Sequence, residues 1–149
     1  MDDAPSARFR CGMRPLKIVL AAASLSAALT FPAFGITSAE RELLARTVHA
    51  EASTEDMTGR RYVVDVVLNR VDSPEFPGSI EDVISQRHQF STWGNGMIAD
   101  AEPTEADYQA VDLETAGPRL STEILFFTAG RYNKYCTPLF RHGRHYFGK

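Results

Sequence analysis

The apolar residues of the segment 43–51 recur at helical spacing. Leu43 and Leu44 are followed by Glu51, which lies eight and seven residues further on. These intervals place Glu51 on the same helix face as the leucines. Thr37, with Glu40 three positions later, has the pattern of a capping box at a helix start. We therefore predict a helix from about residue 38 to Glu51.

The next apolar segment, residues 62–71, fits two kinds of secondary structure. Its many valines favour a strand, whereas Tyr62, Val66 and Arg70 repeat at helical spacing. Asp65 would interrupt a fully buried strand, while a helix can turn this side chain outward. We therefore predict a second helix here.

The remainder of the chain alternates between short periodic segments and loops. Residues 80–85, preceded by Ser79, and residues 104–116 have capping patterns and are predicted helices. Residues 86–103 show no clear periodicity and are predicted to form a long loop of the kind that often carries function. Residues 124–128 are the best strand candidate, and the turn residues after them indicate a small C-terminal hairpin.

The first 35 residues have the pattern of a secretory signal peptide. Basic residues precede an apolar run from Ile18 to Leu29, and Ala33 and Gly35 supply the small residues of a signal-peptidase site. The run is short for a membrane span, and a retained weak anchor, giving transient membrane association, is the alternative. We predict a signal peptide at 1–35 and one exported domain at 36–149, periplasmic or associated with the cell wall.

Charge is distributed unevenly over the predicted exported domain. Residues 36–118 carry 6 basic and 16 acidic side chains, whereas residues 119–149 carry 6 basic side chains against Glu123 alone. The acidic part argues against general nucleic-acid binding, while the basic segment could attract an anionic polymer. Cys136 is the single cysteine after residue 35, so an intramolecular disulfide is excluded there. We expect Cys136 to be a half-buried packing residue.

Several catalytic motifs can be tested against the chain. The zinc deaminase signature begins H-x-E, as at 49–51, but needs a downstream P-C-x-x-C that is absent. H-E-x-x-H, G-x-S-x-G, Walker and dinucleotide-binding patterns are also absent. His142 and His145 could join His49 or His88 around zinc, although exposed loop histidines are the commoner explanation. We expect no metal and no cofactor.

Glu51 is the strongest candidate for chemistry. A carboxylate that continues an apolar helix face must find a partner or hold its proton, and a held proton is what a general acid needs. On periodicity alone, a salt bridge to an arginine is the commoner outcome, with Arg46, Arg61 and Arg70 available. Glu55 could raise the pKa of Glu51 from one helical turn away, and residues 86–93 offer the amides and rings that carbohydrate sites use.

The stretch from His49 to Val71 resembles the signature of the spore cortex-lytic (SleB-type) cell wall hydrolases. That signature reads approximately Y-G-E-A-R-G-E, a short spacer, a glycine, an apolar helix and L-N-R-V, and it aligns here without a gap. Residues that match it are Glu51, Ala52, Glu55, Gly59, Leu68, Asn69, Arg70 and Val71. His49-Ala50 stands in place of Tyr-Gly, and Ser53-Thr54 in place of Arg-Gly. Later segments, including 73–77, 89–91, 125–127 and 143–147, also resemble the family.

The resemblance implies an α+β, mainly α-helical, lysozyme-like fold with a small β-hairpin element. It also implies an enzyme that cleaves peptidoglycan between N-acetylmuramic acid and N-acetylglucosamine, and we expect it to be a monomer. Family members are described as lytic transglycosylases, in which one glutamic acid serves as both acid and base. Glu51 is then the catalytic residue. The expected substrate-binding residues are Glu55, Gln89, Phe90, Trp93 and Asn69.

Two other functions remain open from the sequence. A zinc-dependent N-acetylmuramoyl-L-alanine amidase would use the histidines, and a non-catalytic wall-binding protein would need no acid. The basic C-terminal segment adds a further hypothesis, in which Arg141 and Arg144 contact the carboxylates of peptidoglycan stem peptides.

Overall fold

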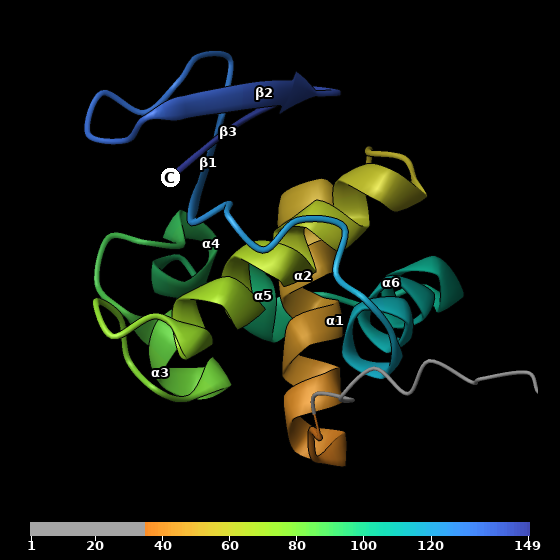
Figure 1. The fold of residues 1–149 in the computed structure, drawn as a ribbon. Helices are drawn as coiled ribbons and strands as arrows, with labels where there is room; N and C mark the ends of the chain where they lie inside the picture. Colours follow the sequence, from red (N-terminus) through yellow and green to blue (C-terminus); the bar gives the residue numbers. More distant parts are fainter. Residues whose placement is uncertain (1–34) are drawn as a thin grey trace, which may run out of the picture.

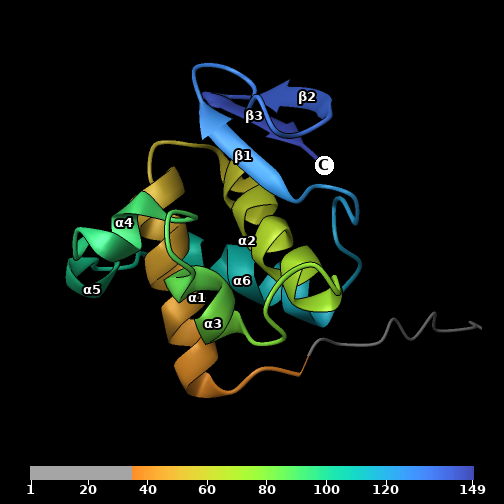
Figure 2. The same ribbon diagram turned by 90° about the vertical axis from the view of Figure 1, so that its left-hand side faces the viewer.

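The structure is a computed structural model that describes residues 35–149. Apart from Gly35, the predicted signal peptide and its alternative as an anchor lie outside the described residues. In residues 35–149 the helices form one body, and a small antiparallel sheet lies at one end of it (Figures 1 and 2). None of the helices in this range is both long enough and apolar enough to cross a membrane.

The elements follow the predicted order. The helices are α1 (Ser38–Ala52), α2 (Met57–Asp72), α3 (Ile80–Ser85), α4 (Ser91–Gly94), α5 (Met97–Asp100) and α6 (Glu105–Ala116), and the strands are β1 (Phe126–Ala129), β2 (Pro138–His142) and β3 (His145–Gly148). The sheet order is β1-β3-β2, with both pairs antiparallel. The four longer helices and the C-terminal hairpin are thereby confirmed.

Two of the predicted segments differ in part from the structure. The segment 86–103 was predicted to be a loop, but it contains the single helical turns α4 and α5. Four residues are too few to show a 3.6-residue period, and neither turn has a side-chain cap that would mark it in sequence. The strand predicted at 124–128 begins two residues later, because Ile124 is fully buried and leads into the sheet as part of the core.

Helix α2 is the central element. Val63, Val66 and Leu68 have no exposed surface, and the other apolar residues between them are equally buried. A helix that is apolar on all sides belongs in the core, which explains why a valine-rich run is helical here. Asp56 caps the helix by accepting a hydrogen bond from the backbone N–H of Gly59 at 2.8 Å.

Asp65, on α2, does not turn outward as predicted. Its side chain is fully buried against α6 and accepts a hydrogen bond from the backbone N–H of Ser121 at 2.9 Å. Because α2 is surrounded on all sides, no face of the helix could have placed Asp65 in water.

A buried carboxylate joins the three longest helices behind the end of α1. Asp107, near the start of α6, is fully buried and accepts from the Nδ1 atom of His49 at 2.9 Å, while Arg60 on α2 also donates to it. Thr104 completes the set, with its backbone N–H 2.7 Å from the same carboxylate. Buried ionic groups of this kind need such partners, and here they fix the orientation of α1.

The sheet packs onto the helical body through aromatic side chains. Phe147 of β3 is fully buried with Val66 of α2 and Ile124, and Phe127 of β1 contacts both this cluster and the helical core. The rings of Phe140 and Phe147 stack with centroids 5.2 Å apart. These contacts place β1 and the β2–β3 turn close to the C-terminal end of α1.

Candidate active site

Glu51 lies in the last turn of α1 and is half-buried. Leu44 and Val48, on the same face, are fully buried. Burial raises the pKa of the Glu51 carboxyl above its ordinary value, and a hydrogen bond from the Thr92 hydroxyl to Oε1 opposes this shift. The net direction is upward, so the environment favours the protonated acid.

Two of the three arginines that could have neutralised Glu51 are paired with other carboxylates, and the third, Arg70, forms no ion pair with Glu51. Arg46 donates to Glu42 at 2.7 Å, and Arg61 is paired with Glu114. Within residues 35–149, Glu51 forms no salt bridge, and the hydrogen bond from Thr92 uses only Oε1. The salt-bridge alternative is therefore wrong, and Oε2 remains available to carry a proton.

Glu51 opens onto a cavity of about 520 Å³, which we call the acid cavity. Its wall is formed by the end of α1 and the following turn, the segment before α4, strand β1 and the β2–β3 turn. Elements far apart in sequence therefore meet around one carboxyl group. Its lining residues are Ala50, Glu51, Ser53, Thr54, Glu55, His88, Gln89, Ser91, Phe127, Thr128, Ala129, Arg144 and His145.

Glu55, the predicted second carboxylate, lies in the turn between α1 and α2 and lines the acid cavity. Its Oε1 accepts a hydrogen bond from the backbone N–H of Arg144 at 3.2 Å. A Cβ at Gly143 would lie 1.7 Å from Glu55 Oε2, so only glycine leaves room for this contact. Glu55 thus attaches the β2–β3 turn to the helical body.

His145 forms part of the cavity wall and has only 6% of its surface exposed. Its ring lies edge-on to Phe127 with centroids 5.1 Å apart. Burial lowers the pKa of the imidazole below its ordinary value, so His145 is neutral at neutral pH. His145 therefore adds no positive charge to the wall of the acid cavity.

Of the other predicted substrate-binding residues, some line the acid cavity and some do not. Gln89 lines the acid cavity, but Phe90 is only 4% exposed and packs in the core against Phe127. Trp93, on α4, is 40% exposed and is not part of the cavity wall. Asn69 donates to the carbonyl oxygens of Ser121 and Ile124, both at 2.9 Å, and so holds the segment before β1. Only Glu55 and Gln89 therefore share the cavity with Glu51.

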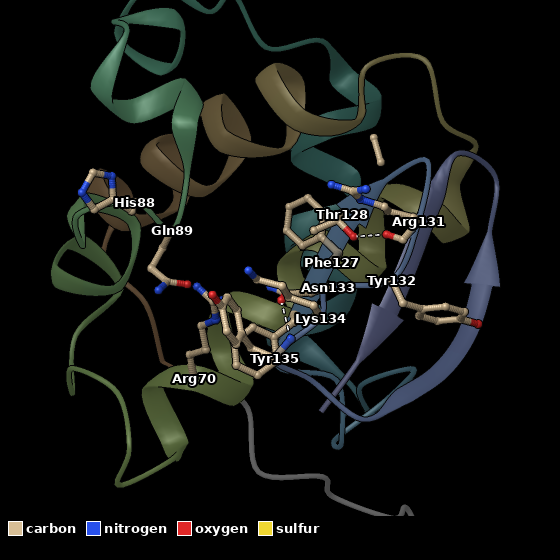
Figure 3. A pocket seen from close by; sticks show the side chains of 12 residues that line it. Arg70, His88, Gln89, Phe127, Thr128, Arg131, Tyr132, Asn133, Lys134 and Tyr135 are labelled. Carbon is tan, nitrogen blue, oxygen red and sulfur yellow. Dashed lines mark hydrogen bonds between the residues drawn. The ribbon is translucent and has the colours of Figure 1, made fainter.

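A second cavity, of about 880 Å³, adjoins the first, and Figure 3 shows the side chains that line it. The two share lining residues His88, Gln89, Phe127, Thr128 and Ala129. The second is also lined by Arg70 of α2 and by the loop after β1, including Arg131 and Lys134, and we call it the cationic cavity. Together the cavities form one groove, with Glu51 and Glu55 at one end and a cluster of basic residues at the other.

Sequence reasoning missed several of these residues. Thr92 follows Gln89 by three positions, yet nothing in the sequence indicates that its hydroxyl reaches Glu51. The cationic residues of the groove come from α2 and from residues 131–134, and only the tertiary fold brings them together. The general excess of basic residues after position 118 was the one available signal.

Two of the four histidines have carboxylate partners. His49 is 2.9 Å from Asp107, and the Nε2 atom of His142 is 2.8 Å from Asp56. In the part of the chain that the structure covers, no group of three or more histidine, cysteine or acidic residues is arranged to hold a metal ion. The donor set that the amidase alternative requires is not assembled from these residues.

Comparison with known families decides the classification. The sequence profile described as Cell Wall Hydrolase matches residues 54–148, which is more than half of the chain. The chain belongs to this cell wall hydrolase family. The matched range begins three residues after Glu51, so it includes Glu55 and the sheet but not the candidate acid itself.

Curated relatives of this cell wall hydrolase include spore cortex-lytic enzymes. The one from Bacillus subtilis is 33% identical over 93 residues, covering 62% of this chain and 30% of the relative. The one from Halalkalibacterium halodurans is 34% identical over 76 residues, covering 51% of this chain and 23% of the relative. The chain therefore matches less than a third of the length of either relative.

Solved structures support the fold. The catalytic domain of the Bacillus cereus SleB protein superposes with a TM-score of 0.69 at 27% identity, covering 77% of this chain and 93% of that one. The catalytic domain of the germination-specific lytic transglycosylase SleB from Bacillus anthracis gives 0.65 at 25% identity, covering 77% and 98%. This cell wall hydrolase has the lysozyme-like, mainly helical fold that the sequence resemblance implied.

Proposed function

We propose that this cell wall hydrolase is a lytic transglycosylase that cleaves peptidoglycan between N-acetylmuramic acid and N-acetylglucosamine. The observation that carries the proposal is Glu51, a carboxyl group with a raised pKa and no salt bridge in the described range, placed at the wall of a cavity. The similarity to the Bacillus anthracis protein, which is described as a lytic transglycosylase, adds support.

In this mechanism Glu51 acts twice. Its protonated carboxyl group gives its proton to the glycosidic oxygen as the bond from that oxygen to the muramyl C1 breaks. The resulting carboxylate then removes the proton from the muramyl 6-hydroxyl, whose oxygen bonds to C1 and closes a 1,6-anhydro ring. Glu51 returns to its protonated form, and no water is consumed.

This chemistry fits a site in which one carboxyl group has a raised pKa. Hydrolytic glycosidases of the usual kind need two carboxyl groups, one as acid and one as nucleophile or base. Here Glu55 is held by the backbone of the β2–β3 turn, and we assign it to substrate positioning together with Gln89. The hydroxyl of Thr92 would steady Glu51 Oε1 through both steps.

The setting of the reaction is part of the proposal. Peptidoglycan lies outside the cytoplasmic membrane, which agrees with an exported enzyme acting in the periplasm or at the wall after removal of residues 1–35. We propose general peptidoglycan strands as the substrate and a monomer as the working form.

Mass spectrometry of digested, purified sacculi tests the reaction. The proposal expects fragments ending in 1,6-anhydromuramic acid, each lighter by one water than the matching lysozyme product. Fragments with free reducing muramic ends would contradict transglycosylation. Released peptides with intact glycan strands, together with inhibition by a chelator, would favour the amidase instead.

A further inference from the structure

Arg70 is a buried cation whose charge has no protein partner. Its side chain is 3% exposed and lines the cationic cavity, where Nε donates to the carbonyl oxygen of Leu125 at 2.7 Å. Its Nη1 atom is buried with no hydrogen-bond partner among residues 35–149, and no carboxylate in that range pairs with it. Burial lowers the pKa of the guanidinium to about 10, so it is still charged at neutral pH.

Aromatic rings hold Arg70 in this position. The guanidinium carbon lies 4.9 Å from the ring centroid of Phe76 and 5.4 Å from those of Phe90 and Phe126. Cation–π contacts offset part of the desolvation cost but leave N–H groups unsatisfied. An unpaired buried charge is costly for a protein to keep, and the negative charge of an anionic ligand in the cavity would offset that cost.

Two more cations stand at the rim of the same cavity. Arg131 and Lys134 are exposed on the loop between β1 and β2, and neither forms an ion pair with a residue that the structure describes. The Lys134 ammonium lies 4.6 Å from the ring centroid of Tyr135. Figure 3 shows this loop facing Arg70 and Gln89. The residues lining the cavity include no Asp or Glu.

The unbalanced positive charge of the groove therefore lies in the cationic cavity, whereas the acid cavity contains both Glu55 and Arg144. The acid end of the groove would hold the scissile glycosidic bond, and its basic end begins where the two cavities share Gln89 and Thr128. The sugars of peptidoglycan are uncharged, whereas the stem peptide on the muramyl lactyl group carries free carboxylates. That peptide branches away from the glycan strand, so it could enter a cavity that adjoins the one holding the scissile bond.

We propose that the cationic cavity binds the stem-peptide carboxylates of the muramyl residue next to the scissile bond, through Arg70, Arg131 and Lys134. This inference rests on the proposed function for the identity of the glycan. It moves the peptide contact away from Arg141, which donates to the carbonyl oxygen of Gly143 at 3.0 Å and lines neither cavity. Arg144 lines only the acid cavity.

Binding of soluble fragments to a Glu51→Gln parent, which should not turn them over, tests the inference. The ligands are the N-acetylglucosamine–N-acetylmuramic acid disaccharide with a tripeptide and the same peptide-free disaccharide with its lactyl carboxyl group capped as the amide, compared by calorimetric titration. The parent should prefer the peptide-bearing ligand, and Arg131→Gln with Lys134→Gln should reduce this preference by about three- to tenfold. Arg87→Gln with Lys149→Gln removes the same charge elsewhere and should leave the preference unchanged.

NMR spectroscopy tests the role of Arg70 without replacing it, because replacing this buried residue risks unfolding the core. In NMR spectra of the parent, the side-chain N–H signals of Arg70 should shift on adding the peptide-bearing ligand and not the peptide-free one. Equal affinity for both ligands, or the same loss of preference in both double variants, would overturn the inference. Persistent preference, together with no glycan cleavage of sacculi by the unmodified protein, would instead overturn the proposed function and leave this inference standing.

Discussion

The chemistry of Glu51 depends on what surrounds it. The same residue type with a salt bridge would be an ordinary structural carboxylate, but the neighbouring arginines are paired with Glu42 and Glu114. Burial then raises the pKa, and the Thr92 hydroxyl limits the rise by stabilising the charged form. Activity that needs the protonated acid is expected to fall as the pH rises through this pKa.

Thr92→Val removes the hydroxyl while keeping the shape of the side chain. Because the lost hydrogen bond favours the carboxylate, the pKa of Glu51 should rise further. The alkaline limb of the kcat/KM profile should move to higher pH, with the maximal rate reduced by less than about tenfold. Turbidity loss of sacculi across a pH series measures this.

Thr115→Val is the matched control for this substitution. Thr115 is also buried, but its hydroxyl donates to the carbonyl oxygen of Val111 within α6, and it does not line the groove. Its pH profile should remain that of the unmodified protein. An alkaline limb that stays in place or moves to lower pH in Thr92→Val would refute the role given to Thr92.

Sequence was informative about Glu51 because a helix has a fixed period. Seven- and eight-residue intervals placed it on the buried face of α1, and the neighbouring motif resembled a known family. Thr92 offered no comparable signal, because its contact with Glu51 spans 41 residues and depends on α4, a single turn. Phe90 and Gln89 are adjacent in sequence, yet one enters the core and the other the cavity.

At the scale of elements, the sheet is joined to the helices at the active site. Glu55 connects the α1–α2 turn to the β2–β3 turn, whose Gly143 has a left-handed backbone with φ of 53°. Gly59 allows a similar close approach, because a Cβ there would lie 2.8 Å from that of Glu55. The sequence predicted both the hairpin and α2, but their contact through Glu55 required the tertiary structure.

Gly143→Ala should disrupt this junction. The new methyl group would clash with Glu55 Oε2, and alanine is strained in a backbone conformation with positive φ. We therefore expect a loss of about 2–3 kcal/mol in unfolding free energy. Thermal unfolding should then occur roughly 8–20 °C lower. Activity should fall as well, because the β2–β3 turn forms part of the cavity wall.

Gly130→Ala separates backbone strain from the clash. Gly130 has φ of 83° and open space where a Cβ would stand, so this variant should lose only about 1 kcal/mol. Equal destabilisation of the two variants would mean that the contact with Glu55 contributes nothing to stability.

At the scale of the whole molecule, a buried pair of acids lies where α2 meets α6. Asp65 is held next to Glu114, and burial together with this neighbour raises the pKa of Asp65 to about 9. The unfolded chain would ionise Asp65 near pH ~3.9. The stability that this group contributes is therefore fully present below about pH 4 and is lost as the pH rises towards about 9.

Asp65→Asn imitates the protonated acid at every pH. Its unfolding free energy should therefore decline less between about pH 5 and pH 8 than that of the unmodified protein, by on the order of 2 kcal/mol. Urea unfolding at a series of pH values measures the difference. Asp100→Asn, at an exposed position on α5, should reproduce the unmodified curve. Parallel curves for Asp65→Asn and the unmodified protein would contradict the raised pKa.

The central claim is that Glu51 is the acid of a glycan-cleaving enzyme, and its isosteric replacement tests it most directly. Release of soluble fragments from purified sacculi should fall by at least about 100-fold in Glu51→Gln, while the variant still binds sacculi and unfolds at a similar temperature. Glu75→Gln, at an exposed loop position, should remain fully active. Full fragment release by Glu51→Gln would contradict the account.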